Sequence, residues 1–289
     1  MPRISVEVGY NRRWLTNFNN VDNTTNTAAD FTQFSVTAPL DPRLPGGGGY
    51  VLSNLYNVNP NVATLQNNVT SLASDYGTES QTYNGMLLNL SARPRNGLMF
   101  QGGFSTGKTN MDYCSVRAVL PEALNLSGLP ATPLPAGQGQ TDPYCNSNTG
   151  WITRYTGLGS YTVPKVDVLF SGTFRSDQGA PLAANWSASN AVIQPSLGRP
   201  LANAATSASI NLIEPGTMFG DRVNEVDIRL AKILKFGRTR TNIGFDIYNI
   251  LNSAAVLSYN QAFVPNGQWL TPNSVILPRF WKFSFQVDF

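Results

Sequence analysis

Apolar and polar residues alternate one by one along several segments of the chain. At the N-terminus Ile4, Val6, Val8 and Tyr10 alternate with polar or small residues. Because successive side chains of a strand point to opposite faces, this period of two predicts strands with one apolar and one polar face. The pattern recurs within 86–93, 98–105, 165–175, 226–230 and 242–247, and more weakly in 151–163 and 186–193. We therefore expect an all-β, antiparallel fold.

Tight turns and very long connections separate the expected strands. Arg95–Gly97 and Phe236–Arg238 are short turns with a glycine, as in hairpins. By contrast, the connections at roughly 16–82, 110–150, 191–206 and 253–273 are rich in Asn, Thr, Gly and Pro. A median loop has about 4–6 residues. Tight turns on one side and long loops on the other are typical of outer-membrane β-barrels.

The last ten residues distinguish a membrane strand from a strand of a soluble sandwich. One face of this segment is apolar and carries Trp281, Phe283, Phe285, Val287 and Phe289. The other face carries Lys282, Ser284, Gln286 and Asp288. As a soluble edge strand, this ladder would invite aggregation. It resembles the C-terminal signature by which barrel proteins are recognised and inserted in the Gram-negative outer membrane, and we interpret it as a lipid-facing closing strand.

Composition excludes several other classes of protein. Only 13% of the 289 residues are charged, against about 25% in a typical soluble domain, and no stretch approaches the ~20 apolar residues of a membrane helix. The net charge of +3 comes without a basic run, so we expect no nucleic-acid partner. The absence of histidine removes the commonest general base and zinc ligand. We expect no enzyme activity, no cofactor and no metal site.

Cys114 and Cys145 are the only cysteines. An even count is compatible with one disulfide in an oxidising compartment. Metal binding is the alternative, but two thiols without another soft ligand make a poor site. We therefore predict a disulfide that closes a loop of about 30 residues and stabilises it by roughly 3–4 kcal/mol.

Charged residues recur on the polar faces of the expected strands. We expect them to line the lumen of a barrel and to pair there; they are Lys165, Asp167, Arg175, Asp227, Arg229 and Asp246. The alternative is that Asp167, Asp227 and Asp246 converge as catalytic carboxylates.

Two glycine-rich motifs could either bind a phosphate or another anion, or simply form part of a strand or a turn. Gly102–Thr109 matches the phosphate-loop pattern GxxxxGK[ST]. That motif requires a strand, the loop and then a helix, whereas here the alternation continues through Phe104 and no helical period follows. We interpret it as part of a strand, and Gly46–Gly49 as a turn of a surface loop rather than an anion-binding loop.

Four segments, in this order, carry a resemblance to a known family. They are Phe34–Tyr50 (FSVTAPLDPRLPGGGGY), Pro94–Gly107 (PRNGLMFQGGFSTG), Ser160–Phe174 (SYTVPKVDV, then SGTF) and Phe245–Asn252 (FDIYNILN). The set resembles the TonB-dependent outer-membrane receptors of the Oar-like type, which often carry an N-terminal carboxypeptidase-regulatory-like domain. The resemblance assigns Gly102–Thr109 to a barrel hairpin.

The resemblance implies a 22-stranded barrel with an N-terminal plug and a TonB-contacting segment. About ten strand candidates fill this chain, so we expect residues 1–289 to form the C-terminal part of such a barrel. This partial, up-and-down transmembrane barrel would have about 10–12 strands and long extracellular loops, and would lack the plug and the TonB box.

The expected role follows from the same resemblance. It is uptake of a large or scarce solute, such as a siderophore, cobalamin, an oligosaccharide or a peptide, across the Gram-negative outer membrane. Expected partners are outer-membrane lipid, the barrel-assembly machinery, an unknown solute, and the TonB system through the missing N-terminal part. Three alternatives stay open: an autonomous porin of about 10–12 strands that conducts passively, a membrane-embedded hydrolase, and a soluble β-rich adhesin.

Overall fold

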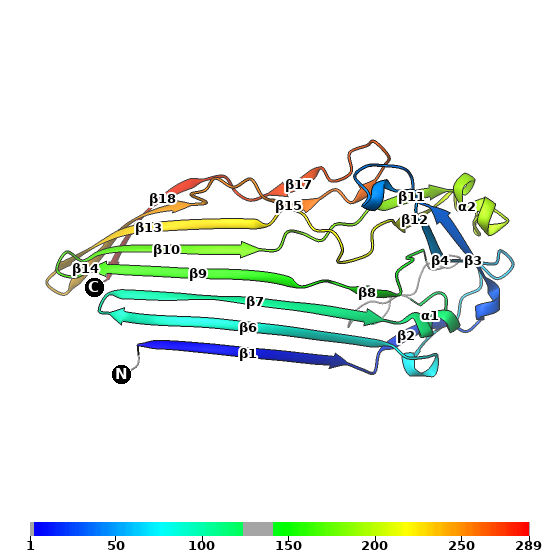
Figure 1. Ribbon diagram of the computed structural model, residues 1–289, viewed down its shortest axis with the longest axis horizontal. Helices are drawn as coiled ribbons and strands as arrows, with labels where there is room; N and C mark the ends of the chain where they lie inside the picture. Colours follow the sequence, from blue (N-terminus) through cyan, green and yellow to red (C-terminus); the bar gives the residue numbers. More distant parts are fainter. Residues whose placement is uncertain (1–2, 124–140, 289) are drawn as a thin grey trace.

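The computed structural model describes residues 3–123 and 141–288. Its largest element is one antiparallel sheet of eight long strands, with the short β8 (Asn146–Asn148) paired to β7 (Figure 1). In sheet order the long strands are β1 (Ile4–Leu15), β6 (Ser80–Arg95), β7 (Leu98–Asp112), β9 (Ile152–Val163), β10 (Val168–Asp177), β13 (Val223–Phe236), β14 (Thr239–Tyr248) and β18 (Phe280–Asp288). The predicted all-β, antiparallel fold is confirmed.

Tight turns join the long strands at one end of the sheet, which we call the turn end (Figure 1). Gly97 and Gly237 occupy two of these turns with φ of 78° and 60°, a conformation that glycine adopts without strain. The third turn lies between β9 and β10 and contains Lys165 and Asp167, also at positive φ. The expectation that these two residues lie on a strand is therefore wrong, because β10 begins only at Val168.

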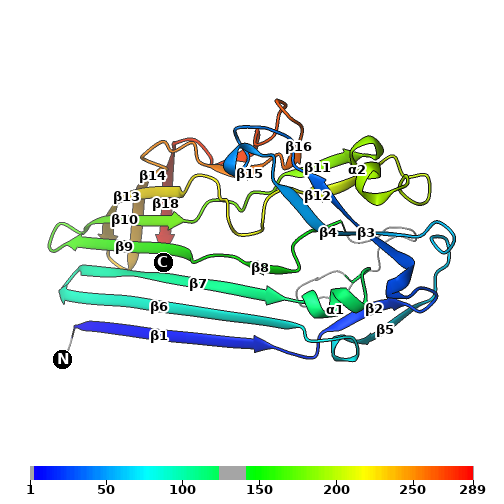
Figure 2. The same cartoon turned by 45° about the vertical axis from the view of Figure 1, so that its right-hand side comes forward.

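The main sheet is open. β1 and β18 each pair with one neighbour only, so the described residues form no closed barrel. The sheet nevertheless curves, and β13, β14 and β18 turn away from the plane of β1, β6 and β7 (Figure 2).

The long connections gather at the opposite end, the loop end, and they are not structureless. They contain the pairs β2 (Asn19–Asn23) with β5 (Asn68–Leu72), β3 (Phe31–Thr37) with β4 (Val51–Val58), and β15 (Val256–Tyr259) with β17 (Pro272–Val275). A further sheet joins β11 (Asn185–Ser189) to β12 (Ser207–Asn211) and to β16 (Ala262–Phe263), which runs parallel to β11. The helices are α1 (Cys114–Val119), α2 (Asn190–Leu197) and three 3-10 turns, Ala28–Asp30, Pro45–Gly47 and Ala73–Asp75.

The hydrophobic core also lies at the loop end. Side chains from β3, β4, β11, β12, α2 and the 262–270 loop are buried together, among them Phe34, Leu55, Ile193, Ile210 and Trp269. We call the part of the chain that surrounds this core the loop domain. The weak strand expected at 186–193 is wrong in its second half, because β11 ends at Ser189 and α2 begins at Asn190.

Candidate functional site

The main sheet presents one apolar face, to which every long strand contributes. The strand register brings alternate apolar residues into line across all eight strands. The large exposed side chains of this face include Ile4, Val6, Val8, Tyr10, Met86, Phe100, Tyr155, Phe170, Phe174, Ile228, Leu230, Ile243, Trp281, Phe283 and Phe285. Val8 is 77% and Phe283 78% exposed. No layer of the described chain covers this face, so it is a contiguous apolar surface that demands a partner.

The predicted membrane-insertion residues lie on this apolar face of β18. Trp281, Phe283 and Phe285 are exposed, and Val287 is half-buried. The rings of Phe283 and Phe245 lie 4.9 Å apart across the β14–β18 pair. Phe289, the last residue of the predicted signature, lies outside the described residues.

The opposite face is polar and carries ion pairs. Arg229 bridges to Asp246 at 3.3 Å, and the Asp246 carboxylate is buried. Arg175 pairs with Asp177 at 3.1 Å and with Glu225 at 3.4 Å. The structure thus brings Arg175, Arg229 and Asp246 to one face of the sheet.

The remaining predicted polar residues have other partners. Asp227 accepts the backbone N–H of Asn249 at 2.9 Å and lies 3.5 Å from the Thr173 hydroxyl. Asp167, in the β9–β10 turn, accepts the Lys235 ammonium at 2.9 Å, and this hydrogen bond holds the pKa of its carboxyl below the ordinary value. Lys165 lies in the same turn. Asp167 lies at the turn end, far along the sheet from Asp227 and Asp246, so the three aspartates do not converge.

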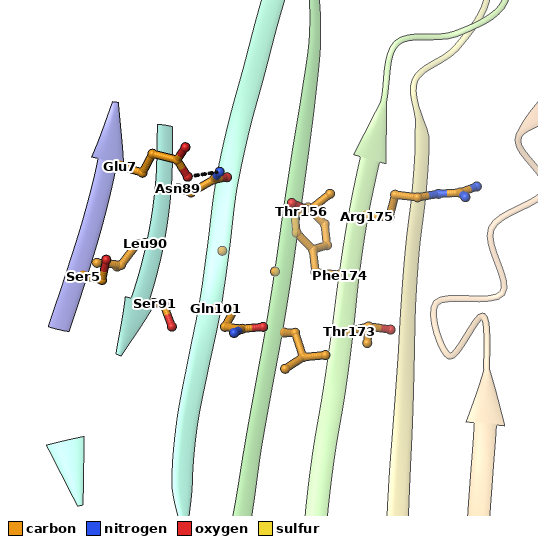
Figure 3. A pocket seen from close by; sticks show the side chains of 13 residues that line it. Ser5, Glu7, Asn89, Leu90, Ser91, Gln101, Thr156, Thr173, Phe174 and Arg175 are labelled. Carbon is orange, nitrogen blue, oxygen red and sulfur yellow. Dashed lines mark hydrogen bonds between the residues drawn. The ribbon is translucent and has the colours of Figure 1, made fainter. Parts of the chain in front are cut away.

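A shallow hollow of about 520 Å³ lies across β1, β6, β7, β9 and β10 (Figure 3). Glu7, hydrogen-bonded to Asn89 at 3.1 Å, marks one side, and Arg175 marks the other. Between them the lining combines hydroxyl and amide side chains, including Gln101 and Thr173, with glycines and the apolar side chains of Leu158 and Phe174. The hydroxyl and amide groups both donate and accept hydrogen bonds, so the hollow offers polar contacts beside apolar ones.

The phosphate-loop motif adds nothing to this site. β7 runs through Gly102–Thr109 without a break, so the motif lacks the strand, loop and helix that phosphate binding requires. The described residues also contain no cluster of His, Cys, Asp or Glu that could hold a metal ion.

A second cavity, of about 570 Å³, lies in the loop domain. Tyr50 and Tyr144 line it, and both hydroxyls donate to the carbonyl oxygen of Leu212, at 2.6 and 3.0 Å. Burial raises the pKa of both phenols. Glu214 and Met218 complete a lining with aromatic, apolar and anionic character.

Arg43, at the edge of this cavity, ties two distant loops together. Its guanidinium pairs with the buried Asp41 at 2.7 Å and donates to the carbonyl oxygens of Val264, Gly267 and Trp269. The five N–H groups of the guanidinium are all used in these contacts. Arg43 also holds the pKa of the Asp41 carboxyl well below its usual range.

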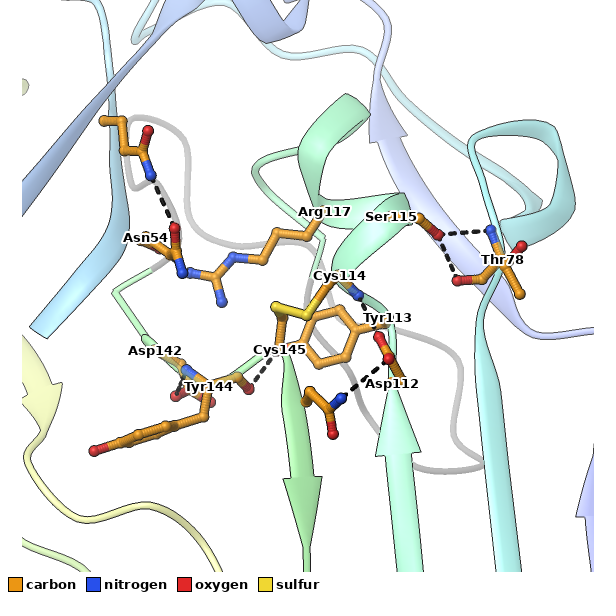
Figure 4. The surroundings of a disulfide bond; sticks show 12 residues. Asn54, Thr78, Asp112, Tyr113, Cys114, Ser115, Arg117, Asp142, Tyr144 and Cys145 are labelled. Carbon is orange, nitrogen blue, oxygen red and sulfur yellow. Dashed lines mark hydrogen bonds between the residues drawn. A yellow bond between two sulfur atoms is a disulfide. The ribbon is translucent and has the colours of Figure 1, made fainter.

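The cysteines form a disulfide at the start of α1 (Figure 4). Their Cα atoms lie 4.9 Å apart, and the bond links α1 to the segment that leads into β8. The Ser115 hydroxyl fastens the other side of α1, because it donates to the carbonyl oxygen of Thr78 at 2.7 Å and accepts the Thr78 N–H.

Arg117, also on α1, is a buried cation that the sequence did not reveal. It is 2% exposed, donates to the carbonyl oxygen of Asn54 and lies over the Tyr56 ring. Burial lowers the pKa of its guanidinium and raises the pKa of the neighbouring Tyr113 to about 12. Its place in an Asn/Pro-rich connection gave no pattern from which burial could be inferred.

Within the part of the chain that the structure describes, no helix is long and apolar enough to cross a membrane. No protein-family model, no curated protein and no solved structure matches the chain.

Proposed function

We propose that the chain forms part of the wall of a TonB-dependent receptor barrel in the outer membrane of a Gram-negative bacterium, and that it serves solute uptake. The observation that carries the membrane half of this proposal is the uncovered apolar face of eight aligned strands. The receptor half rests on the family resemblance of four ordered segments.

The slant of the strand register supports a barrel wall. One line of paired residues starts at the first residue of β1 and crosses the sheet through Ile4, Ala92, Phe100, Gly159, Gly172, Ile228, Ile247 and Trp281. On β1 this line lies at the turn end, but on β18 it lies seven residues short of the turn-end residue Asp288. It therefore climbs about 24 Å over seven strand spacings of ~4.8 Å. The corresponding strand tilt is about 35°, within the range of closed barrels.

The distribution of charge and core argues against a soluble sandwich. A sandwich buries the apolar faces of two sheets against each other, whereas here the apolar face is exposed and the core lies in the loop domain. Lipid chains would cover the apolar face without any protein partner. The polar face, with its ion pairs and hollow, then faces water, as in the interior of an outer-membrane barrel.

The placement of the loops supports a role in solute capture. The described parts of the long connections lie at one end, where a core of their own holds them, and two cavities of about 520 and 570 Å³ open on the polar face and in the loop domain. These volumes suit a small solute or one unit of a larger one. In this proposal the loops bind the solute outside, and a plug and the TonB system move it inwards.

The membrane half is tested by refolding the full chain in plain buffer and in phosphatidylcholine vesicles. We expect a folded monomer only with lipid or detergent. Lipids brominated on their acyl chains should quench tryptophan fluorescence in the chain and quench it less in the Trp281→Phe variant, because Trp281 is exposed on the apolar face. A soluble monomer in plain buffer would contradict the proposal.

The receptor half is tested separately. In cells, deletion of Phe289 should lower assembly into the outer membrane. In planar bilayers the chain should not by itself carry a steady ion current, because an open sheet that forms only part of a barrel wall encloses no pore. A steady, unenergised ion current would favour the passive porin over the receptor.

A further inference from the structure

Two cations lie among aromatic side chains where the apolar face meets the loop end. Arg12 of β1, Asn84 of β6 and Lys108 of β7 are direct cross-strand partners in one row. Directly opposed Cα atoms in antiparallel strands are about 5 Å apart, so the Cα atoms of Arg12 and Lys108 are about 10 Å apart. Arg12 lies four residues from Val8 on β1, and Lys108 lies four from Phe104 on β7, so each shares the apolar face of its strand. Asn84 is paired with both and therefore lies on the same face.

Each cation is stacked on an exposed tryptophan. The Arg12 guanidinium carbon lies 4.6 Å from the centre of the Trp14 ring, and the Lys108 ammonium lies 5.5 Å from that of Trp151. Trp14 is 61% and Trp151 51% exposed. Between them, Asn84 accepts a hydrogen bond from the Tyr10 hydroxyl at 3.0 Å, which orients its amide. We call Arg12, Trp14, Asn84, Lys108 and Trp151 the basic rim.

The cations of the basic rim have no carboxylate partner among the described residues, unlike the arginines that form ion pairs on the polar face. On the polar face, Arg154, Arg175 and Arg229 each lie within salt-bridge distance of a carboxylate. Among the described residues, neither Arg12 nor Lys108 forms such a pair. Arg13 and Lys282 of the polar face also have no ion-pair partner among the described residues, but in the membrane proposal that face is in water. Two unneutralised cations on a mostly apolar face favour an anion from outside the chain.

The height of the basic rim identifies where that anion would be. Arg12 lies eight residues beyond Ile4, and Lys108 lies ten beyond Leu98, both measured from the turn end. At ~3.4 Å per residue and a tilt of about 35°, the rim lies roughly 22–28 Å above the turn end. The apolar band of an outer-membrane barrel is about 25 Å tall, and tryptophan is enriched at its borders. The rim is therefore at the level of the lipid headgroups.

We propose that the basic rim binds a phosphorylated lipid headgroup on the loop side of the membrane, with its phosphate oxygens between Arg12 and Lys108. This inference rests on the proposed membrane location of the sheet. A phosphate accepts charge-assisted hydrogen bonds from both cations. The two tryptophans hold the long cationic side chains in place and contact the upper acyl chain and glycerol.

The test uses the full chain in detergent micelles and phosphatidic acid as the probe, with phosphatidylcholine as the neutral comparison. Native mass spectrometry measures how much of each lipid stays bound. Each basic side chain near a membrane surface changes affinity for anionic lipid by about fivefold. The Arg12→Gln/Lys108→Gln variant should therefore bind phosphatidic acid about thirtyfold more weakly. The matched control is Arg13→Gln/Lys282→Gln, which removes the same charge from the polar face of β1 and β18.

The outcomes separate this inference from the membrane proposal. Selective loss of phosphatidic acid in the rim variant, with the control unchanged, supports the site. Equal loss in both variants, or no preference for phosphatidic acid in the parent chain, overturns it and leaves the membrane proposal standing. A parent chain that is monomeric and folded without detergent overturns both.

Discussion

Phe283 lies where a charge should destabilise the sheet most if its apolar face is in lipid. It is the fourth of the nine residues of β18. Nine residues at ~3.4 Å and a tilt of about 35° span roughly 25 Å, the height of the apolar band. Phe283 is then close to the bilayer midplane, and its side chain is 78% exposed to whatever covers that face.

The expected effect of Phe283→Arg has two parts. An arginine on the lipid face near the midplane costs about 2–4 kcal/mol. The lost ring contact with Phe245, at 4.9 Å, adds about 1 kcal/mol. The total of roughly 3–5 kcal/mol lowers the ratio of folded to unfolded protein by a factor of about 100 or more.

The assay is a urea titration of the chain in phosphatidylcholine vesicles, followed by tryptophan fluorescence. Gln286→Arg is the matched control, because Gln286 lies on the polar face of the same strand next to Asp288. Phe283→Leu keeps the site apolar and measures the ring contact alone. If the unfolding free energy of Phe283→Arg lies within about 1 kcal/mol of that of Gln286→Arg, a lipid-facing β18 is refuted, because the cost of placing a charge in lipid would then be missing.

Three further predictions concern packing, the disulfide and pH. An added Cβ at Gly107 would overlap the Tyr83 side chain, including two of its ring carbons, so Gly107→Ala should lower the unfolding free energy by about 1–3 kcal/mol. Gly159→Ala, with open space around it, is the control in the same urea titration. Equal stability of the two variants would contradict the packing argument. Replacing both cysteines by serine should cost about 3–4 kcal/mol, from the 31-residue separation that the disulfide closes; an unchanged urea midpoint against the oxidised parent would show that the loop is held without it. Burial raises the pKa of Glu122 to about 7, above an unfolded value of about 4.3, so the folded state binds more protons and stability should fall as pH rises from about 4.3 to 7. Glu122→Gln should flatten this slope in the unfolding midpoint, and a slope that survives the substitution would assign it to another group.

The strands of the main sheet could be predicted because their pattern is local. Each long strand alternates apolar and polar residues, and a period of two is visible within a few residues. The hairpin turns at Gly97 and Gly237 could also be predicted from local sequence, since each has a glycine at the position that requires positive φ. Lys165 and Asp167 were misplaced because Val166 continues the alternation into the turn.

The loop domain could not be predicted because its order comes from distant contacts. Its strands have two to eight residues, too few for a period to stand out. Phe34 and Trp269 belong to the same core although they are far apart in the sequence. The helix at Asn190 was mistaken for a strand because Trp186 and Ala188 alternate just before it. The basic rim could not be predicted for a related reason, since only the strand register places Arg12 and Lys108 in one row.

The position of the core separates the residues that shape the loop domain from those available to a solute. A sheet whose apolar face lies in lipid needs no core of its own, whereas loops that project into water must bury apolar side chains against one another. Arg43 belongs to that framework: all its N–H groups have acceptors within the chain, so it has no donor left for a ligand. Glu214 lines the loop cavity, and the hydrogen bonds it makes to described residues use its backbone carbonyl oxygen. Changes at Arg43 should therefore alter the fold of the loops, whereas changes at Glu214 should leave the fold intact and test whether the loop cavity binds a solute.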